Sequence, residues 1–133
     1  MPIGKYIIVV LVFIENSNGE FLFQMTSKRK NSVWATTGGH VKSGQTSKQT
    51  ILEEIKEELG IEINSKEIKL FKTYKYEGAF KDVYYIKKDV NIYDLTYQKD
   101  EVEYAKYLTK EEIIKLINTN GNIKKIIWMP FWI

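Results

Sequence analysis

The sequence lacks cysteine altogether and has only two prolines, one histidine and one arginine among its 133 residues. Without cysteine the chain cannot form disulfide bonds, bind zinc through thiolates or use a thiol nucleophile. This composition is typical of a reducing compartment, so we expect a cytoplasmic location. The one extended apolar run, residues 6–14, is too short to span a bilayer and lacks a small-residue cleavage site. We therefore expect no membrane partner and interpret this run as a buried strand.

Composition and charge indicate a globular protein with one core. Hydrophobic residues make up 44% of the chain and charged residues 28%, and the length suits a single domain over residues 1–133. The formal net charge of +3 comes from lysines that are scattered along the chain. An RNA-binding module would need a clustered basic face interleaved with aromatic residues, so we do not expect a nucleic-acid partner.

One helix is predicted together with both of its ends. Thr46 and Gln49 have the spacing of an N-terminal capping box, and Gly60 is a typical C-terminal stop. The helix should therefore cover about residues 47–59. Four apolar residues recur at helical spacing and should face the core: Ile51, Leu52, Ile55 and Leu59.

The same helix carries a concentration of negative charge, formed by Glu53, Glu54, Glu57 and Glu58. Like charges spaced i,i+4 on an exposed helix cost roughly 0.2–0.5 kcal/mol per pair, and the last turns of a helix favour cations. Only Lys56 lies among these glutamates, so the carboxylates call for a positive partner from outside the helix. Mg²⁺ is a suitable partner, because it takes oxygen ligands from a few carboxylates together with substrate phosphates.

The alternative is that these glutamates form only a solvated acidic face, because glutamate is a good helix former. The segment before the helix favours a site instead. Gly38, Gly39 and Gly44 precede the helix, and glycine permits positive φ angles and close approach of the backbone to a ligand. His40, the sole histidine, lies in this loop and is a candidate for contact with a diphosphate or for proton transfer.

The loop and the helix together resemble the Nudix box, the signature motif of the Nudix hydrolases, which include MutT-like enzymes. The box reads glycine, five residues, glutamate, seven residues, then arginine, glutamate, an apolar residue, any residue, two glutamates, any residue, glycine and an apolar residue. At two positions the chain departs from it, because Gln45 replaces the first glutamate and Glu53 replaces the arginine. It matches the box at Gly39, Glu54, Ile55, Glu57, Glu58, Gly60 and Ile61.

The resemblance implies an α+β fold, an α/β/α sandwich with a mixed sheet. It implies hydrolysis of a diphosphate linked to another group, usually a nucleoside, with Mg²⁺ or Mn²⁺ as cofactor. The metal ligands would be Glu54, Glu57 and Glu58, with Glu54 and Glu57 acting in catalysis. Gly39 would lie against the substrate.

The resemblance also implies site residues outside the box. In many members a glutamate at some distance beyond the box is an extra metal ligand or the general base. Glu101 and Glu103 are the candidates here, and we favour Glu101. A basic residue before the box often contacts the substrate phosphates, which indicates Arg29, whose planar guanidinium suits bidentate phosphate binding.

The two departures from the box support a second hypothesis. The family arginine is thought to orient the neighbouring glutamates, and Glu53 in its place adds repulsion, while Gln45 brings no negative charge. The chain is therefore either an active hydrolase or a Nudix-fold nucleotide-binding or regulatory protein with weakened catalysis. The proline that marks ADP-ribose hydrolases shortly after the box is absent, because the only prolines are Pro2 and Pro130. The catalytic cysteine of Nudix-fold isopentenyl diphosphate isomerases is absent as well. A nucleoside triphosphate or nucleoside diphosphate derivative remains as the small-molecule substrate.

The other elements are predicted from alternation, turns and caps. Residues 6–14 and 20–26 should form a hairpin, and Thr109 with Glu112 should start a second helix that ends near residue 119. Trp34 is interpreted as a core residue rather than a platform for a nucleobase. Further strands are expected at residues 69–76, 80–88 and 101–107, and most aromatic residues of the first two should be core. The apolar tail, residues 123–133, should pack back on the domain or cover a partner subunit in a homodimer.

Overall fold

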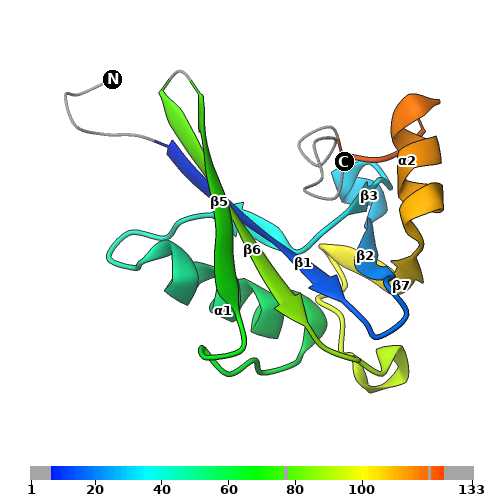
Figure 1. The fold of residues 1–133 in the computed structure, drawn as a ribbon, viewed down its shortest axis with the longest axis horizontal. Helices are drawn as coiled ribbons and strands as arrows, with labels where there is room; N and C mark the ends of the chain where they lie inside the picture. The colour runs from blue at the N-terminus through cyan, green and yellow to red at the C-terminus, as the bar shows by residue number, and fades with distance from the viewer. Residues whose placement is uncertain (1–6, 77, 120, 125–133) are drawn as a thin grey trace.

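The computed structural model describes residues 7–76, 78–119 and 121–124. In these residues a mixed sheet lies between two α-helices, α1 (Ser47–Leu59) and α2 (Lys110–Asn118), as Figure 1 shows. The strands are β1 (Ile7–Glu15), β2 (Phe21–Thr26), β3 (Trp34–Ala35), β4 (Gly38–His40), β5 (Lys69–Tyr76), β6 (Ala79–Lys87) and β7 (Val102–Leu108). Short 3-10 turns lie at Lys28–Lys30 and Ile92–Asp94.

Strand β1 is the centre of the sheet. One of its edges pairs in parallel with β6 along the whole strand. The other edge is shared, because β4 pairs with residues 9–11 of β1 and β2 pairs with its last residue, Glu15. The order β3-β2-β1-β6-β5 is completed by β7 on the far edge of β2. The expected hairpin and the later strands are confirmed, and the sheet is mixed as predicted.

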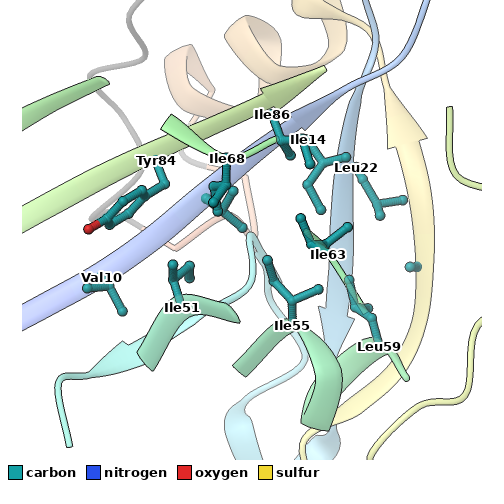
Figure 2. Close-up of a cluster of buried hydrophobic side chains, with 12 residues drawn as sticks. Val10, Ile14, Leu22, Ile51, Ile55, Leu59, Ile63, Ile68, Tyr84 and Ile86 are labelled. Carbon is teal, nitrogen blue, oxygen red and sulfur yellow. The ribbon is translucent and has the colours of Figure 1, made fainter. Parts of the chain in front are cut away.

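Alternation along β1 builds a core on each face of the sheet. Successive residues of a strand point to opposite faces. Val10, Val12 and Ile14 belong to one buried cluster with the apolar stripe of α1, drawn in Figure 2. Leu11 and Phe13 belong to a second cluster, which includes Ile113 of α2. Because β1 is buried on both sides, its sequence is an unbroken apolar run.

The expectation that most aromatic residues of β5 and β6 are core is wrong. Tyr84 of β6 is buried, but Tyr74 and Tyr85 are only partly buried, and Phe71 of β5 is 47% exposed. The reason is the position of β5 at the edge of the sheet, where β6 is its only neighbour among the described strands. An edge strand leaves part of its surface to solvent.

The second helix is confirmed with its predicted cap. The Thr109 hydroxyl accepts a hydrogen bond from the Glu112 backbone, and the Glu112 side chain accepts one from the Thr109 backbone. After this helix, Ile123 is buried and forms an isolated bridge with Trp34. Residues 125–133 lie outside the described residues, so the expected packing of the tail and the homodimer remain predictions. No helix in the described ranges is long and apolar enough to cross a membrane.

Candidate functional site

Helix α1 has the predicted boundaries and caps. Thr46 Oγ1 accepts a hydrogen bond from the Gln49 backbone at 3.1 Å, and Gln49 Oε1 accepts one from the Thr46 backbone at 2.8 Å. At the other end Gly60 has φ +72° and its N–H bonds to the Lys56 carbonyl. Ile51, Ile55 and Leu59 are buried and Leu52 packs against them, so the glutamates occupy the remaining faces.

The glycines before the helix have different roles from those predicted. Gly44 has φ +80°, as expected, but Gly38 and Gly39 lie in strand β4 without positive φ. A Cβ at Gly38 would lie 2.3 Å from the Val10 carbonyl oxygen, so glycine is needed for strand pairing. A Cβ at Gly39 would lie 3.4 Å from the Glu54 carboxyl carbon. The backbone of β4 therefore lies directly against one of the predicted metal ligands.

Glu58 ends a buried chain of hydrogen bonds. Thr37 Oγ1 donates to Gln24 Oε1 at 2.9 Å, and Gln24 Nε2 donates to Glu58 Oε1 at 2.6 Å. Glu58 is only 7% exposed. Burial, together with a hydrogen bond to the Glu54 carboxyl, raises the pKa of Glu58 to about 9. Sequence reasoning missed Gln24 and Thr37; the signal was a glutamine inside the apolar strand β2.

Lys42, which lies before α1 in the sequence, supplies positive charge to these glutamates from outside the helix. Its Nζ lies 2.7 Å from Glu53 Oε1, 3.1 Å from Glu57 Oε1 and 3.5 Å from Glu54 Oε1. Hydrogen bonding to Glu53 is the main reason why the pKa of Lys42 is raised above its usual value. Lys56, the lysine that lies among the glutamates of the helix, pairs instead with Glu62. The expectation of an external partner was therefore incomplete, because a loop lysine reaches the cluster.

The two residues that depart from the box contact each other. Gln45 Nε2 donates to Glu53 Oε2 at 2.6 Å, while Gln45 Oε1 accepts from Thr50 Oγ1 at 2.8 Å. The Lys42 backbone N–H also bonds to Thr50 Oγ1, at 3.2 Å. The hydrogen bonds from Lys42 and Gln45 lower the pKa of Glu53 to about 2, so Glu53 is ionised at neutral pH.

The structure brings Arg29 and Glu101 together although they are 72 residues apart in the sequence. Arg29 Nη2 lies 3.1 Å from Glu101 Oε1, and Lys30 Nζ lies 3.1 Å from Glu101 Oε2. Glu101 immediately precedes β7, and its charge helps to raise the pKa of buried Glu58. Glu103, the other candidate, is exposed on β7. Of the two, Glu101 is therefore the one next to the cluster of glutamates on α1.

A pocket of about 380 Å³ is lined mainly by residues of β1 and β4, with no carboxylate among its described lining residues. Within it, Thr36 is 7% exposed and its hydroxyl has no hydrogen-bond partner among the described residues. His40, exposed at the end of β4, also lines the pocket. Gly39 connects the two regions, because it lines the pocket and contacts Glu54. The remaining lining residues are Val9, Val10, Leu11, Lys30, Gly38 and Lys124.

Trp34 has a packing role, as predicted. Its side chain is half-buried and its ring meets that of Tyr104 edge to face, with centroids 5.7 Å apart. Its backbone carbonyl also accepts a hydrogen bond from the Lys124 N–H. These contacts tie β3 to β7 and to the segment after α2.

The donor set of α1 suits a hard divalent cation. Glu54, Glu57 and Glu58 supply only carboxylate oxygens, and Glu54 and Glu58 are close enough to share a hydrogen bond. In the described part of the chain, no three carboxylate or imidazole groups converge in the geometry of a metal centre. The Lys42 ammonium lies between Glu54 and Glu57 instead. The ligand set therefore remains a prediction that rests on donor chemistry.

Comparisons with known proteins identify relatives of the chain in sequence and in fold. A family model described as the NUDIX domain matches residues 5–131. Uncharacterized Nudix hydrolases of Listeria monocytogenes and Listeria innocua are 38% and 36% identical to the chain over 114 residues, covering 83% of it and 68% of each relative.

Solved structures share the fold at low sequence identity. A Deinococcus radiodurans protein matches with a TM-score of 0.79 at 22% identity, covering 96% of this chain and 83% of that one. A structure from work on MutT of Aliivibrio salmonicida and Vibrio cholerae matches with a TM-score of 0.69 at 20% identity, covering 92% and 91%. A Caenorhabditis elegans Ap4A hydrolase matches with a TM-score of 0.58 at 21% identity, covering 80% and 83%.

Proposed function

The chain belongs to the Nudix family, and we propose that it is a metal-dependent hydrolase of a diphosphate linked to a nucleoside or a related group. The observation that carries the proposal is the position of Glu54 and Glu58. Both lie on α1 within hydrogen-bonding reach of each other, Glu54 against the glycine strand β4 and Glu58 on the buried amide of Gln24. Two carboxyl groups held on a helix by contacts with two strands are pre-positioned for phosphate chemistry.

The metal would be held by Glu54, Glu57 and Glu58. When bound, Mg²⁺ or Mn²⁺ would neutralise phosphate charge and lower the pKa of water that attacks phosphorus. Gln24 would keep the Glu58 carboxyl oriented through its hydrogen bond of 2.6 Å. This arrangement resembles the support that outer residues give to metal ligands in general.

Arg29, Lys30 and Glu101 would act on the substrate together. The two cations hold both oxygens of Glu101 in the free protein. A substrate phosphate competes for the same cations, because charge-assisted hydrogen bonds to phosphate are as strong as those to carboxylate. Binding of the phosphate to Arg29 would therefore release one oxygen of Glu101. That oxygen would then accept the proton of the attacking water.

The pocket beside Gly39 would receive the group attached to the diphosphate. Its volume of about 380 Å³ is within the range of small-molecule sites. The Thr36 hydroxyl has no partner among the described residues and can form a hydrogen bond with a polar ligand. His40 also lines the pocket and lies next to the loop before α1. We infer a nucleoside triphosphate or nucleoside diphosphate derivative as substrate. The structural neighbour from Caenorhabditis elegans is itself named an Ap4A hydrolase.

One observation favours a second candidate, a nucleotide-binding or regulatory protein with weakened catalysis. The Lys42 ammonium lies among the carboxylates, and neither Gln45 nor Glu53 is the residue that the Nudix box has at its position. If Lys42 competes with the metal, nucleotide binding would persist while turnover would be lost.

The experiment that separates the two candidates is a turnover assay on a panel of nucleoside triphosphates and nucleoside diphosphate derivatives. Release of phosphate or pyrophosphate is followed with Mg²⁺, with Mn²⁺ and with EDTA. We expect metal-dependent release from at least one member of the panel. Nucleotide binding without any release would favour the binding protein and would overturn the hydrolase proposal.

A further inference from the structure

The residues that depart from the Nudix box form one connected group rather than two separate defects. Glu53 stands where the family has an arginine, and the missing positive charge is present nearby on Lys42. We propose that Lys42, anchored on Glu53, takes over the task of that arginine and positions the Glu54 and Glu57 carboxylates for a divalent cation. This inference rests on the proposed function, because it assumes that the α1 carboxylates bind a metal.

The contacts of Lys42 reach three carboxylates at once. An ammonium group has three N–H donors, and Nζ lies 2.7 Å from Glu53, 3.1 Å from Glu57 and 3.5 Å from Glu54. The backbone of Lys42 is also fixed, because its N–H donates to Thr50 Oγ1 on α1. Lys42 therefore joins the loop after β4 to the acidic face of the helix through both backbone and side chain.

Gln45 explains why the substitution at position 53 is tolerated. Its amide oxygen accepts a hydrogen bond from Thr50, which leaves the amide nitrogen to donate to Glu53. A glutamate at position 45, as in the family motif, would place a second carboxylate against Glu53. Because Glu53 can only accept a hydrogen bond, the residue at position 45 must donate one. The two departures therefore exchange the donor and the acceptor between positions 45 and 53.

The distances indicate a positioning residue rather than a substitute for the metal. The shortest contact of Lys42 is with Glu53, which is not a predicted metal ligand, and its longest is with Glu54. An ammonium anchored on Glu53 can remain in place when Glu54 and Glu57 bind another cation. A plain counter-ion would behave in the opposite way, because its removal would leave the carboxylates free and tighten metal binding.

The dissociation constant of Mn²⁺, measured by titration calorimetry on the full chain, tests the inference. We expect Lys42→Met to weaken Mn²⁺ binding by about tenfold, which is the usual effect of removing a partner of a metal ligand. Lys42→Arg should stay within about threefold of wild type, because the guanidinium keeps the charge and the donors. A role confined to folding would leave the Mn²⁺ affinity of the folded variants unchanged.

A second pair of variants keeps the test decisive even if Lys42→Met folds poorly. Glu53→Arg alone should weaken Mn²⁺ binding, because it removes the anchor and places two cations together. Combining it with Lys42→Met leaves a single cation, the arginine of the box, beside the carboxylates and should recover binding to within about threefold of wild type.

Three results would overturn the inference. They are tighter binding in Lys42→Met, unchanged affinity in Lys42→Met, or no recovery in the double variant. Absence of Mn²⁺ binding by the wild-type protein would overturn the proposed metal site itself and this inference with it, whereas tighter binding in Lys42→Met would leave the proposed function intact. The two failures are therefore distinguishable.

Discussion

Glu58 is an ionisable residue in a buried position, and burial opposes the ionisation of its carboxyl group. It is buried on the side of α1 that faces β2, and its pKa of about 9 lies far above the ordinary 4.5 of glutamate. A carboxyl whose pKa is raised by folding stabilises the protein below the unfolded pKa, and this contribution is lost as the pH rises through the folded value. Without a metal, stability should therefore fall as the pH rises from about 5 to 9.

Glu58→Gln should remove this dependence. Glutamine keeps an oxygen that can accept the bond from Gln24 but cannot ionise. In EDTA at pH 8 we expect the variant to melt about 3 °C or more above wild type, with the difference shrinking toward pH 5. Differential scanning fluorimetry across this range is the measurement. A difference in melting temperature that does not change with pH would contradict the account. With Mg²⁺ present the advantage should shrink or reverse, because the variant loses a proposed ligand.

Glu101 and Glu103 provide a matched pair of variants. Glu101→Gln removes the proposed general base, and we expect kcat to fall by about 100-fold or more. Glu103→Gln changes an exposed glutamate two residues away on β7 and should leave kcat unchanged. Both changes affect solvent-accessible charges, so each should alter the free energy of unfolding by less than about 1 kcal/mol. Equal rates in the two variants would exclude Glu101 as the base.

The sequence motif predicted the glutamates of α1 but not the residues that contact them. The box pattern indicated Glu54, Glu57 and Glu58 because their spacing along a helix is fixed by the helix itself. Lys42 and Gln24 reach the same cluster from other elements. Such contacts depend on how the loop after β4 and strand β2 are placed against α1, which no local spacing encodes.

At the scale of elements, strand β4 and helix α1 act as one unit. β4 pairs with β1, where Gly38 lets the two backbones approach closely, and Gly39 of β4 lies against Glu54 of α1. The caps of α1 fix where the carboxylates stand relative to this strand. Sequence reasoning predicted the helix from Thr46 to Gly60 correctly, because capping and periodicity are local properties.

Two glycine variants test whether Gly38 is needed for the close pairing of β4 with β1. At Gly38 an alanine Cβ would lie 2.3 Å from the Val10 carbonyl oxygen, in the backbone of β1. Gly44 has no atom within 4 Å of the same Cβ position, and its only constraint is φ +80°. We expect Gly38→Ala to cost about 3 kcal/mol or more and Gly44→Ala about 1 kcal/mol. Urea unfolding measures both, and similar losses would contradict this role of Gly38.

The strand order could not be predicted in the same way. The parallel pairing of β1 with β6 joins segments more than 70 residues apart, and β2 pairs with β7 over a similar separation. Alternation and turn signals predicted the strands, but pairing between distant strands depends on the whole core. The mixed sheet was expected from the resemblance to the Nudix family alone. The exposure of Phe71 on β5 followed from strand order and was therefore mispredicted.

At the scale of the molecule, one strand organises both the core and the site. β1 contributes to the core on each face, and its outer edge passes from β4 to β2. On this side β2 and β4 present Gln24 and Gly39 to the carboxylates of α1, and Gly39 also lines the pocket. Residues from distant parts of the chain therefore meet beside the central strand of the sheet.

The central claim is that the carboxylates of α1 carry metal-dependent hydrolysis. The most direct test compares wild type, Glu57→Gln and Glu62→Gln on the best nucleotide of the panel, with and without Mg²⁺. Glu62 is a suitable control, because it is exposed just beyond α1 and its ion pair within the described part of the chain is with Lys56. We predict Mg²⁺-dependent release by wild type and Glu62→Gln, and a rate lowered by at least about tenfold in Glu57→Gln. Wild-type rates in Glu57→Gln, or release in EDTA, would contradict the account.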